Sequence, residues 1–582
     1  MTGEEPKDLR FDRQLRLWSN HGQECLQNAN LCFINSCGIS TEILKNLVLP
    51  SIGSFTIIDS KTVSKSDLGS NFFVDIDSYG KPRATVVCEN LLRLNPYVKG
   101  NYLIKDINMI IESEPSFLQQ FDVIISTDPT ESLTVKLKKL CRNMNIPFLV
   151  CYTIGMIGFL QVHIDEHTII ESHPDATIPD LRLDIPIPGM NELIHLEHNN
   201  FVKELTLSEK LTMTAHDFGH IPWLIIIKHA LNKYYETHEN KYPSNFKERK
   251  IIVEIIQNYQ SSIIDLLKRE DPEESRNLYE LENFKEAISA VNTALNPTRI
   301  PDEVQEVLQA SESINLSHLE DRQNKSPFQN PRLFWTLVKA LKEFVDERGY
   351  LPLRGSIPDM ASDTKRYLEL QNLYKTVHEE HVNIIEEKSI KLGTKIDKAI
   401  VQIFVKNAFF IRLLRGDESE TDLSPTKLQN LSLMPNSPEN DSLYWYWTLK
   451  AALLFLEDHQ RWPGCFKAYS NTSPGAMDAA CSQALVKKSD DIQDLIQRDI
   501  ALLSNYLGKF LRASPELSQN LCTNHIMEMV RFGGGEIHAI SAFCGGIAAQ
   551  EVIKLITHQF VPIFNKPLIY NGINQSVNTI DF

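Results

Sequence analysis

The sequence predicts an α/β protein in which a wound, Rossmann-like sheet is interrupted by a large, mainly helical insertion and completed by the C-terminus. Short apolar runs alternate with helical patterns through the first ~165 residues. Helical periodicity then dominates to about residue 530, and the remaining residues return to the first pattern. The predicted segments are therefore 1–170, 171–530 and 531–582.

The first segment alternates strands and helices in the order that a parallel sheet requires. Ligands of such sheets bind at the carboxyl ends of the strands, so any site is expected near the first turn. The predicted strands are Leu31–Ile34, Ser54–Asp59, Phe121–Ser126 and a run from Pro147, and the predicted helices are Thr41–Pro50, Lys81–Leu94 and Glu131–Met144.

The clearest helix of the second segment begins at Asn330-Pro331, a cap followed by a first-turn proline, and ends at Gly349. Polar stretches at 309–330 and 417–442 are predicted to be loops. The other predicted helices are Trp223–Tyr235, Arg249–Leu267, Asn283–Leu295, Ile396–Phe409, Leu443–Leu456, Ile492–Leu511 and, in the last segment, Ile537–Thr557, before strands at Pro567–Tyr570 and Ser576–Ile580.

Composition narrows the function classes. The 582 residues include 59 Lys and Arg against 75 Asp and Glu, a net charge of −16, which argues against nucleic acid as the main partner. Ten cysteines without a CxxC pair favour reduced thiols over a zinc site or disulfides. The uncharged run 146–164 contains Pro147, Gly155 and Gly158, which favours two strands and a bend over a membrane span. We expect no nucleic acid, membrane or bound metal.

The first turn, Asn35–Ser40, lies where a nucleotide-binding protein would have G-x-G-x-x-G. Only Gly38 is present, so the close approach of backbone N–H groups to a phosphate is not predicted. Asp59, at the end of the second strand, has two interpretations: it binds ribose hydroxyls, or it caps a turn as a relic. The missing glycines favour the second.

Several motifs resemble those of the ubiquitin-type activating enzymes, whose fold is the ThiF-type adenylation fold. The resemblance covers essentially the whole chain. It rests on Arg10–Gln14, Leu17-Trp18, Gly22-Gln23, Ile43–Asp59, Asn71–Phe73, Gly80-Lys81, Thr153–Gly155, Gly158 and Gly545–Lys554.

Further segments are similar to the non-catalytic subunit of the Nedd/Rub activating enzyme: Ser172–Asp175, Leu181–Asp184, Leu351–Met360 and Asn571–Ile573. The resemblance implies a heterodimer with a catalytic subunit. That complex adenylates the C-terminal glycine of a Nedd/Rub-type modifier with ATP, forms a thioester on the partner's cysteine, and feeds cullin neddylation through a conjugating enzyme. It also implies a location in the cytoplasm and nucleus.

The sequence departs from the catalytic members of that family at each nucleotide motif. Asp59 is followed by Ser60-Lys61 in place of D-x-D, and Asn71 is followed by Phe72-Phe73 in place of an arginine. The segment 126–131 lacks the family's aspartate and asparagine–arginine pattern, and Lys81 alone remains. The departures imply a pseudoenzyme that binds no cofactor, with ATP and Mg²⁺ held by the partner.

Arg13 is the residue for which the resemblance implies a direct chemical role, because the family's R-x-x-R-Q arginine reaches the partner's ATP site. A guanidinium donates several N–H groups in a fork that suits phosphate. The alternative is a surface or interface ion pair. Gln14 is a second candidate at the partner interface.

The segment Leu351–Met360 packs inward or docks the partner, and we expect docking. The expected contacts are Leu351, Pro352, Leu353, Arg354, Gly355, Ile357, Pro358, Asp359 and Met360.

Other functions stay open. A small subunit of a SUMO-type activating enzyme is disfavoured by the ~360-residue insertion, and a nicotinamide-dependent oxidoreductase by the missing glycines. A self-sufficient adenylating enzyme is a further alternative. The insertion corresponds to the family's catalytic-cysteine region without its nucleophile, and Cys522, with only a faint likeness to that motif, is predicted to be a buried structural thiol.

Overall fold

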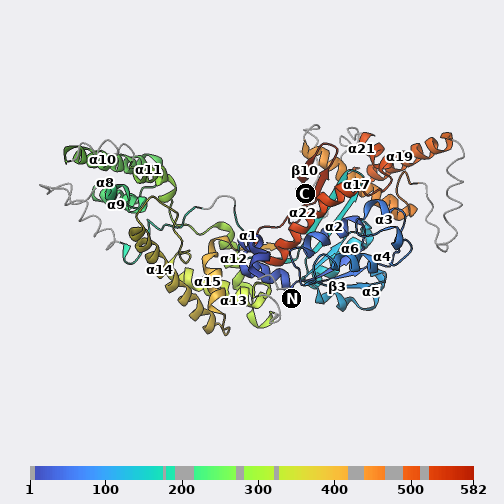
Figure 1. The fold of residues 1–582 in the computed structure, drawn as a ribbon, viewed down its shortest axis with the longest axis horizontal. Helices are drawn as coiled ribbons and strands as arrows, with labels where there is room; N and C mark the ends of the chain where they lie inside the picture. Colours follow the sequence, from blue (N-terminus) through green and yellow to red (C-terminus); the bar gives the residue numbers. More distant parts are fainter. Residues whose placement is uncertain are drawn as a thin grey trace, which may run out of the picture. The chain divides into compact units, whose positions relative to one another are not determined.

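The computed structural model divides the chain into two compact units. Unit 1 contains 1–169, 323–329 and 413–582, and unit 2 contains 170–322 and 330–412. Figure 1 shows both as ribbons coloured along the sequence. The residues described are 7–174, 178–190, 215–270, 281–319, 321, 327–416, 438–465, 489–511 and 523–581.

Unit 1 is built on an eight-stranded sheet. Five neighbouring strands, β5, β4, β1, β2 and β3, are parallel, while β6, β9 and β10 extend the sheet in antiparallel pairs. In spatial order the strands are β10 (Ser576–Thr579), β9 (Leu568–Asn571), β6 (Ile157–His163), β5 (Phe148–Ile154), β4 (Val123–Ser126), β1 (Asn30–Ile34), β2 (Ser54–Ile58) and β3 (Lys99–Leu103).

Alternate residues of each central strand enter different cores, as the two-residue period of a strand requires. Leu31 and Phe33 of β1 belong to one apolar cluster, and Cys32 and Ile34 belong to the other. The first cluster lies under α1 (Lys7–Asn28), α2 (Gly38–Val48), α4 (Arg83–Leu92) and α22 (His538–Thr557).

The second face of the sheet is covered partly by helices that the sequence assigned to the insertion. Leu449, Leu503 and Met529 share the second core with the strands. The predicted return to the α/β part at 531 therefore differs from the structure, where the chain rejoins unit 1 at Leu413. The helices that contribute to this core are α5 (Ile107–Ser113), α6 (Glu131–Asn143), α17 (Pro438–His459), α19 (Ser489–Leu511) and α21 (Thr523–Phe532).

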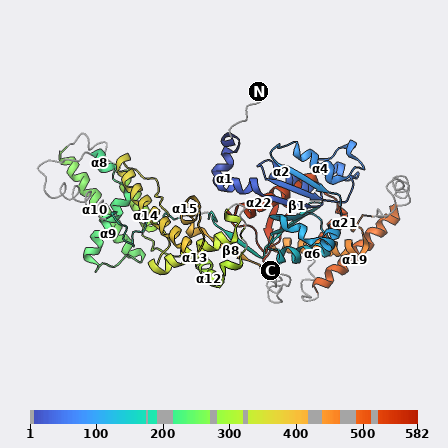
Figure 2. The same ribbon diagram turned by 90° about the horizontal axis from the view of Figure 1, so that it is seen from below.

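Small residues in α22 allow it to pack closely against α2, and Figure 2 shows the two helices side by side. A Cβ on Gly545 would lie 2.8 Å from the Cβ of Glu42, so a larger residue would separate the helices. By length and composition α22 could cross a membrane, but 56% of its most apolar window is buried within the protein. It has the burial of a core helix.

Unit 2 is helical. Its core includes the completely buried side chains of Leu224, Phe284 and Tyr374. The helices are α8 (Ala215–Gly219), α9 (Trp223–Thr237), α10 (Phe246–Glu270), α11 (Glu282–Ala294), α12 (Asp302–Ser313), α13 (Pro331–Arg348), α14 (Thr364–Lys391) and α15 (Lys398–Lys406). A second sheet pairs β7 (Glu166–Ile169) with β8 (Arg412–Arg415).

Most predicted elements are confirmed to within a few residues, although α1, β3 and α14 were not predicted. The differences also include three boundaries. The helix after β1, α2, begins at Gly38 and not at Thr41, because the turn after β1 is shorter than expected. The predicted loop at 309–330 starts inside α12, which ends at Ser313. Of the predicted loop at 417–442, residues 417–437 lie outside the described residues and 438 onward belongs to α17.

Candidate functional site

The crevice of unit 1 opens where β1, β2 and β4 end, at the position predicted for a ligand site. Asn35 follows β1 with a left-handed φ of 75°, which asparagine tolerates better than most residues. Cys37 precedes Gly38, the first residue of α2. A Cβ on Gly38 would lie 2.6 Å from the carbonyl oxygen of Ser70, so this glycine is required by a close backbone approach.

The N-terminus of α2 is capped by a side chain from the other end of the chain. The Gly38 backbone N–H donates to Glu536 Oε2 at 3.1 Å, and the Ile39 N–H donates to Oε1 at 2.6 Å. The Ser541 hydroxyl also donates to Oε1, at 2.9 Å. A helix N-terminus stabilises an anion through its unpaired N–H groups and its dipole. Glu536 therefore occupies the two donors that would otherwise face a phosphate.

A buried arginine fills the adjoining part of the crevice. Arg83 donates through Nε to Asp59 Oδ2 at 2.9 Å, through Nη1 to Asp67 Oδ1 at 2.7 Å, and through Nη2 to the side chain of Asn35. The Arg83 side chain is only 7% exposed, and the two carboxylates are 3% and 8% exposed. Both carboxylates of this cluster thus share the single positive charge of Arg83.

Arg83 and Asp67 each shift the pKa of the other toward the charged form. Burial lowers the pKa of Arg83, but the Asp59 and Asp67 carboxylates outweigh it and the net shift is upward. Burial raises the pKa of Asp67, but Arg83 and the hydrogen bonds from Ser64 lower it overall. Burial also raises the pKa of Glu536, against the hydrogen bonds from Ser541 and the two amides.

Asp59 makes the contacts of a turn cap. It accepts the backbone N–H of Ser36 at 3.1 Å and the Ser36 hydroxyl at 2.5 Å, both on Oδ2. Its Oδ1 accepts the Lys61 N–H at 2.9 Å. Both oxygens are engaged, which agrees with the second of the two interpretations. Lys81, which the family uses at the nucleotide, is exposed.

The remaining turn residues are packed and unreactive. Ser40 donates to the Asn35 carbonyl at 2.9 Å and lies 2.5 Å from the Thr127 hydroxyl. Burial, followed by the Glu536 charge, raises the pKa of Cys37 to about 11, so its thiol stays protonated at neutral pH.

These residues do not fit a nucleotide. A phosphate at the start of α2 would meet the Glu536 carboxylate, and a ribose at Asp59 would have to displace Ser36 and Arg83. Within the described residues, no group of three or more His, Cys, Asp or Glu side chains is placed to hold a metal ion. Sequence reasoning missed Arg83 and Glu536, because nothing local distinguishes them: Gly38 and Glu536 are 498 positions apart.

Arg13 lies on α1, and its side chain is 86% exposed. Its Nε lies 3.8 Å from a carboxylate oxygen of Asp12, a long distance for an ion pair. The helix is broken at Ser19, which has φ 59° and ψ −179°. Gln14 is half-buried, and its Oε1 is buried without a hydrogen-bond partner in the part of the chain that the structure describes. Arg13 is therefore free to meet a group outside this chain.

The C-terminal half of α1 is anchored to unit 1 by the motif residues that follow Arg13. Trp18 Nε1 donates to Gln23 Oε1 at 3.0 Å, and Gln23 Nε2 donates to the Pro50 carbonyl at 3.0 Å. Gln559 Nε2 donates to the Trp18 carbonyl at 3.0 Å. A Cβ on Gly22 would lie 2.8 Å from the Cβ of Trp18. These contacts hold the second half of α1 on unit 1, next to the half that carries Arg13.

The segment 351–360 lies in unit 2 and is held from within. Leu351 and Leu353 are 0% and 1% exposed, and Pro352 is buried with them. The Leu353 N–H donates to His381 Nδ1 at 2.9 Å. The prediction that Leu351, Pro352 and Leu353 dock a partner is wrong for these side chains, because they pack into their own unit.

The rest of that segment is half-buried or exposed. Gly355 has a left-handed φ of 80°, and a Cβ there would lie 2.7 Å from His378. Ile357 and Met360 pack against the core of unit 2, and Asp359 is exposed. For these residues, and for Arg354 and Pro358, the partner contact stays a prediction.

Exposed apolar side chains come from the segments that follow Asn71 and Glu536. Phe72 and Ile76 are 74% and 73% exposed, and Ile537 is 42% exposed. The Phe72 ring lies 6.4 Å from the ring of His538, which places the two chain segments together. We call Phe72, Ile76 and Ile537 the crevice patch.

The model of the ThiF family matches residues 11–582. The chain belongs to the ThiF family. That match takes in the crevice, Arg13 and unit 2 alike, so the helical unit is an insertion within a ThiF-family chain and not a separate protein fused to it.

Several curated relatives of this ThiF-family chain share one functional name. This chain is 35% identical over 588 residues to the NEDD8-activating enzyme E1 regulatory subunit of Gallus gallus, with 98% of each chain covered. It is 34% identical to the regulatory subunit AXR1 of Arabidopsis thaliana, with 98% of this chain and 95% of that one covered. The regulatory subunit of Saccharomyces cerevisiae is 25% identical, with 98% and 99% covered.

Proposed function

We propose that this ThiF-family chain is the regulatory subunit of a heterodimeric activating enzyme for a Nedd/Rub-type modifier. In the proposal, a catalytic subunit holds ATP and Mg²⁺, adenylates the C-terminal glycine of the modifier, and receives it as a thioester on its own cysteine. The conjugating enzyme meets that complex and feeds cullin neddylation. One observation carries the proposal: Glu536 and Arg83 fill the crevice of a chain whose relatives are regulatory subunits.

Electrostatics supports the non-catalytic role. A triphosphate brings several negative charges, and the crevice already holds three carboxylates against the single positive charge of Arg83. Moving a charged group from a buried position without its partner costs several kcal/mol, about 3–5 for a broken buried pair. Nucleotide binding would need at least one such rearrangement, so this chain is proposed to leave the nucleotide to its partner.

Arg13 is proposed to act on the partner's nucleotide. There ATP would supply an adenylyl group, with pyrophosphate as the leaving group, which makes the modifier's carboxylate reactive. Arg13 offers a charged fork of N–H donors from an exposed helix whose other half is fixed by Trp18 and Gln23. Its part is to bind and orient negative charge in trans, as arginines supplied by one protein to another do in phosphate chemistry.

The crevice patch is proposed as part of the contact with the catalytic subunit. Clustered exposed aromatic and aliphatic side chains mark protein interfaces when they lie together on a surface. Phe72 stands where the catalytic members have an arginine, so an apolar residue takes the place of a phosphate-binding one. That exchange favours a protein partner over a nucleotide at this position.

The proposal is tested by a charging assay with purified components. The chain, a catalytic subunit, a Nedd8-type modifier and ATP are mixed, and the modifier thioester is followed on a non-reducing gel. We expect charging only when both subunits are present. Charging by this chain alone would refute the non-catalytic role, and charging of a SUMO-type modifier in its place would move the chain to the alternative family.

A further inference from the structure

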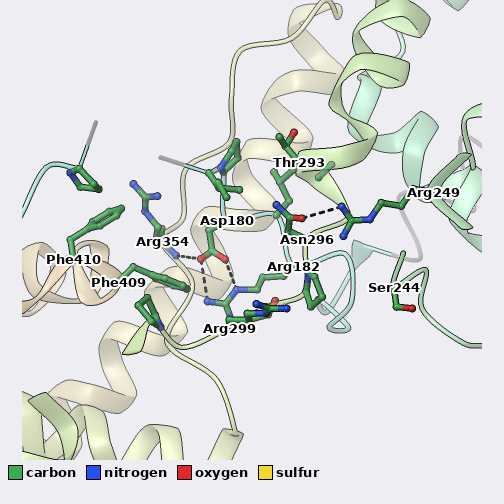
Figure 3. A pocket seen from close by; sticks show the side chains of 18 of the residues that line it. Asp180, Arg182, Ser244, Arg249, Thr293, Asn296, Arg299, Arg354, Phe409 and Phe410 are labelled. Carbon is green, nitrogen blue, oxygen red and sulfur yellow. Dashed lines mark hydrogen bonds and ion pairs between the residues drawn. The ribbon is translucent and has the colours of Figure 1, made fainter. Parts of the chain in front are cut away.

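Unit 2 contains a pocket of about 510 Å³ that the crevice chemistry does not explain. The pocket size is within the range of small-ligand sites. Five arginines and one aspartate are among its lining residues, although the chain as a whole carries a net charge of −16. Figure 3 labels Asp180 and four of the arginines, together with Phe409 and Phe410 from the residues before β8.

Three of the five arginines are used by the protein itself. Arg182 pairs with Asp180 and donates to the Leu351 carbonyl at 2.8 Å. Arg249 donates to the carbonyls of Asn292 and Leu295 at 2.8 and 3.1 Å, where it caps the C-terminal end of α11. These contacts account for the structural roles of Arg182 and Arg249.

Arg412 is the third. Its Nη1 donates to the carbonyls of Phe409 and Ile411 at 3.4 and 2.8 Å, and its Nη2 lies 3.8 Å from Glu303.

Arg354 and Arg299 remain. The Arg354 backbone N–H donates to Asp180 at 3.2 Å, but its guanidinium stacks on Phe410 at 4.5 Å and its buried Nε has no hydrogen-bond partner in the described part of the chain. In Figure 3 the dashed lines at Asp180 reach Arg182 and the Arg354 backbone. Arg299 is exposed, and among the described residues it has no ion pair.

A guanidinium left without an anion is unfavourable where water is partly excluded. Burial lowers the pKa of Arg354 despite the opposing effect of the Asp180 charge, so Asp180 compensates the Arg354 charge only in part. Asp180 already accepts hydrogen bonds from Arg182 and from the Arg354 backbone, so it is not available to pair with the Arg354 guanidinium. A ligand carboxylate or phosphate would provide the missing partner.

The walls of the pocket distinguish between those two anions. Pro174, Pro179, Pro297 and Pro301 line it, and proline has no backbone N–H to offer a phosphate. The lining residues include no glycine, so nothing among them resembles a phosphate loop. Ile178, Phe409 and Phe410 add apolar surface. Apolar walls with two unpaired guanidinium groups suit a peptide that carries both carboxylates and an apolar side chain.

We propose that this pocket binds a short acidic peptide segment, with Arg299 and Arg354 on its carboxylates and an apolar side chain against Phe409 and Phe410. All the lining residues belong to unit 2, and none belongs to the crevice. The pocket is therefore separate from the crevice, although Arg354 also belongs to the segment predicted to contact the partner, and peptide binding by the isolated chain can fail or succeed whatever the charging assay shows.

The test uses the full chain and fluorescein-labelled peptides in an anisotropy titration. The acidic probe is Asp-Glu-Leu-Glu-Asp, the neutral probe is Asn-Gln-Leu-Gln-Asn, and a third probe has Ser for the central Leu. We expect saturable binding of the acidic probe, no binding of the neutral one, and weaker binding of the third. Arg299→Ala and Arg354→Gln should each weaken the acidic probe about 10-fold, as expected for loss of a charge-assisted hydrogen bond.

Arg348→Ala is the matched control, because Arg348 is exposed at the end of α13 in the same unit and lies outside the pocket lining. It should change the affinity less than about 2-fold, since a single exposed charge at a distance is screened. Arg299 is exposed, so its loss does not threaten folding.

Four results would overturn the proposal: no binding of the acidic probe, equal binding of the neutral probe, unchanged affinity in Arg299→Ala, or an equal loss in Arg348→Ala. Displacement by micromolar pyrophosphate would assign the pocket to a phosphate ligand and would also overturn it.

Discussion

Replacement of Arg83 by methionine tests the filled crevice through stability. Methionine keeps most of the volume and removes the charge, so Asp59 and Asp67 lose their shared cation while they stay 3% and 8% exposed. Removing one partner of a buried pair costs about 3–5 kcal/mol. Asp59 retains Ser36, and Asp67 retains hydrogen bonds from Ser64, so the lower end, about 3 kcal/mol, is expected.

The loss of stability in Arg83→Met depends on pH, and its direction follows from the pKa of Asp67. The pKa of Asp67 is lowered in the folded protein, so its contribution is present above its unfolded pKa and disappears as the pH falls through the folded value. In Arg83→Met that contribution is removed, and protonation relieves the unpaired carboxylates. The difference between variant and wild type should therefore hold from pH 7 down to about pH 4 and shrink as the pH falls below 3.8, the ordinary pKa of an aspartate.

The assay is urea unfolding of the full chain, with hydrogen exchange of peptides from 30–59 to localise the effect to unit 1. Arg93→Met is the control, because Arg93 is exposed ten residues later and should change stability by less than about 0.5 kcal/mol. Asp67→Asn should cost less in the Arg83→Met background than in the wild type. Equal stability of Arg83→Met and wild type at pH 7 would refute the buried ion-pair cluster.

Three further predictions address other residues. Glu536→Gln should lower the free energy of unfolding by about 1 kcal/mol, since the amide has one acceptor oxygen for the two N–H groups of Gly38 and Ile39, and an unchanged urea midpoint would count against the cap. Burial, followed by the Arg182 charge, lowers the pKa of His381 to about 4, so the unfolded state takes up a proton first and unit 2 loses stability as the pH falls from 6.5 to 4. His381→Gln should flatten that pH dependence of stability, and an unaltered pH profile would show that His381 is not its source. Arg13→Ala should leave subunit association intact and slow modifier-dependent pyrophosphate exchange roughly 10-fold or more; a normal rate at saturating ATP and modifier would remove the role in trans.

Local sequence signals predicted the elements whose ends and faces are set by neighbouring residues. Asn330 caps α13 by accepting the N–H groups of Arg332 and Leu333, and Gly349 ends the helix with φ 78°, as the sequence indicates. The strand pair around Gly155 is confirmed for the same reason, because that glycine takes a left-handed φ of 57°.

Elements that mix polar and apolar residues on their buried side were missed. The longest helix, α14, buries His381, Lys388 and Ser389 beside Leu370 and Tyr374, so its apolar period is broken. Similarly, helical periodicity cannot tell which core a helix covers. That is why α17, α19 and α21 were assigned to the insertion although they cover the sheet of unit 1.

The candidate site was predictable only in what it lacks. The absence of the glycine loop is visible in Asn35–Ser40, but the groups that replace the ligand come from distant positions. Arg83 and Glu536 have ordinary sequence neighbours, and only the folded sheet brings them to the end of β1. A sequence read alone shows a missing site, whereas the structure shows a filled one.

Calorimetric titration of the isolated full-length chain with Mg-ATP tests the central claim most directly. Internal carboxylates and a paired arginine are predicted to leave no saturable heat of binding up to millimolar nucleotide. A one-to-one isotherm with a micromolar Kd would contradict the account.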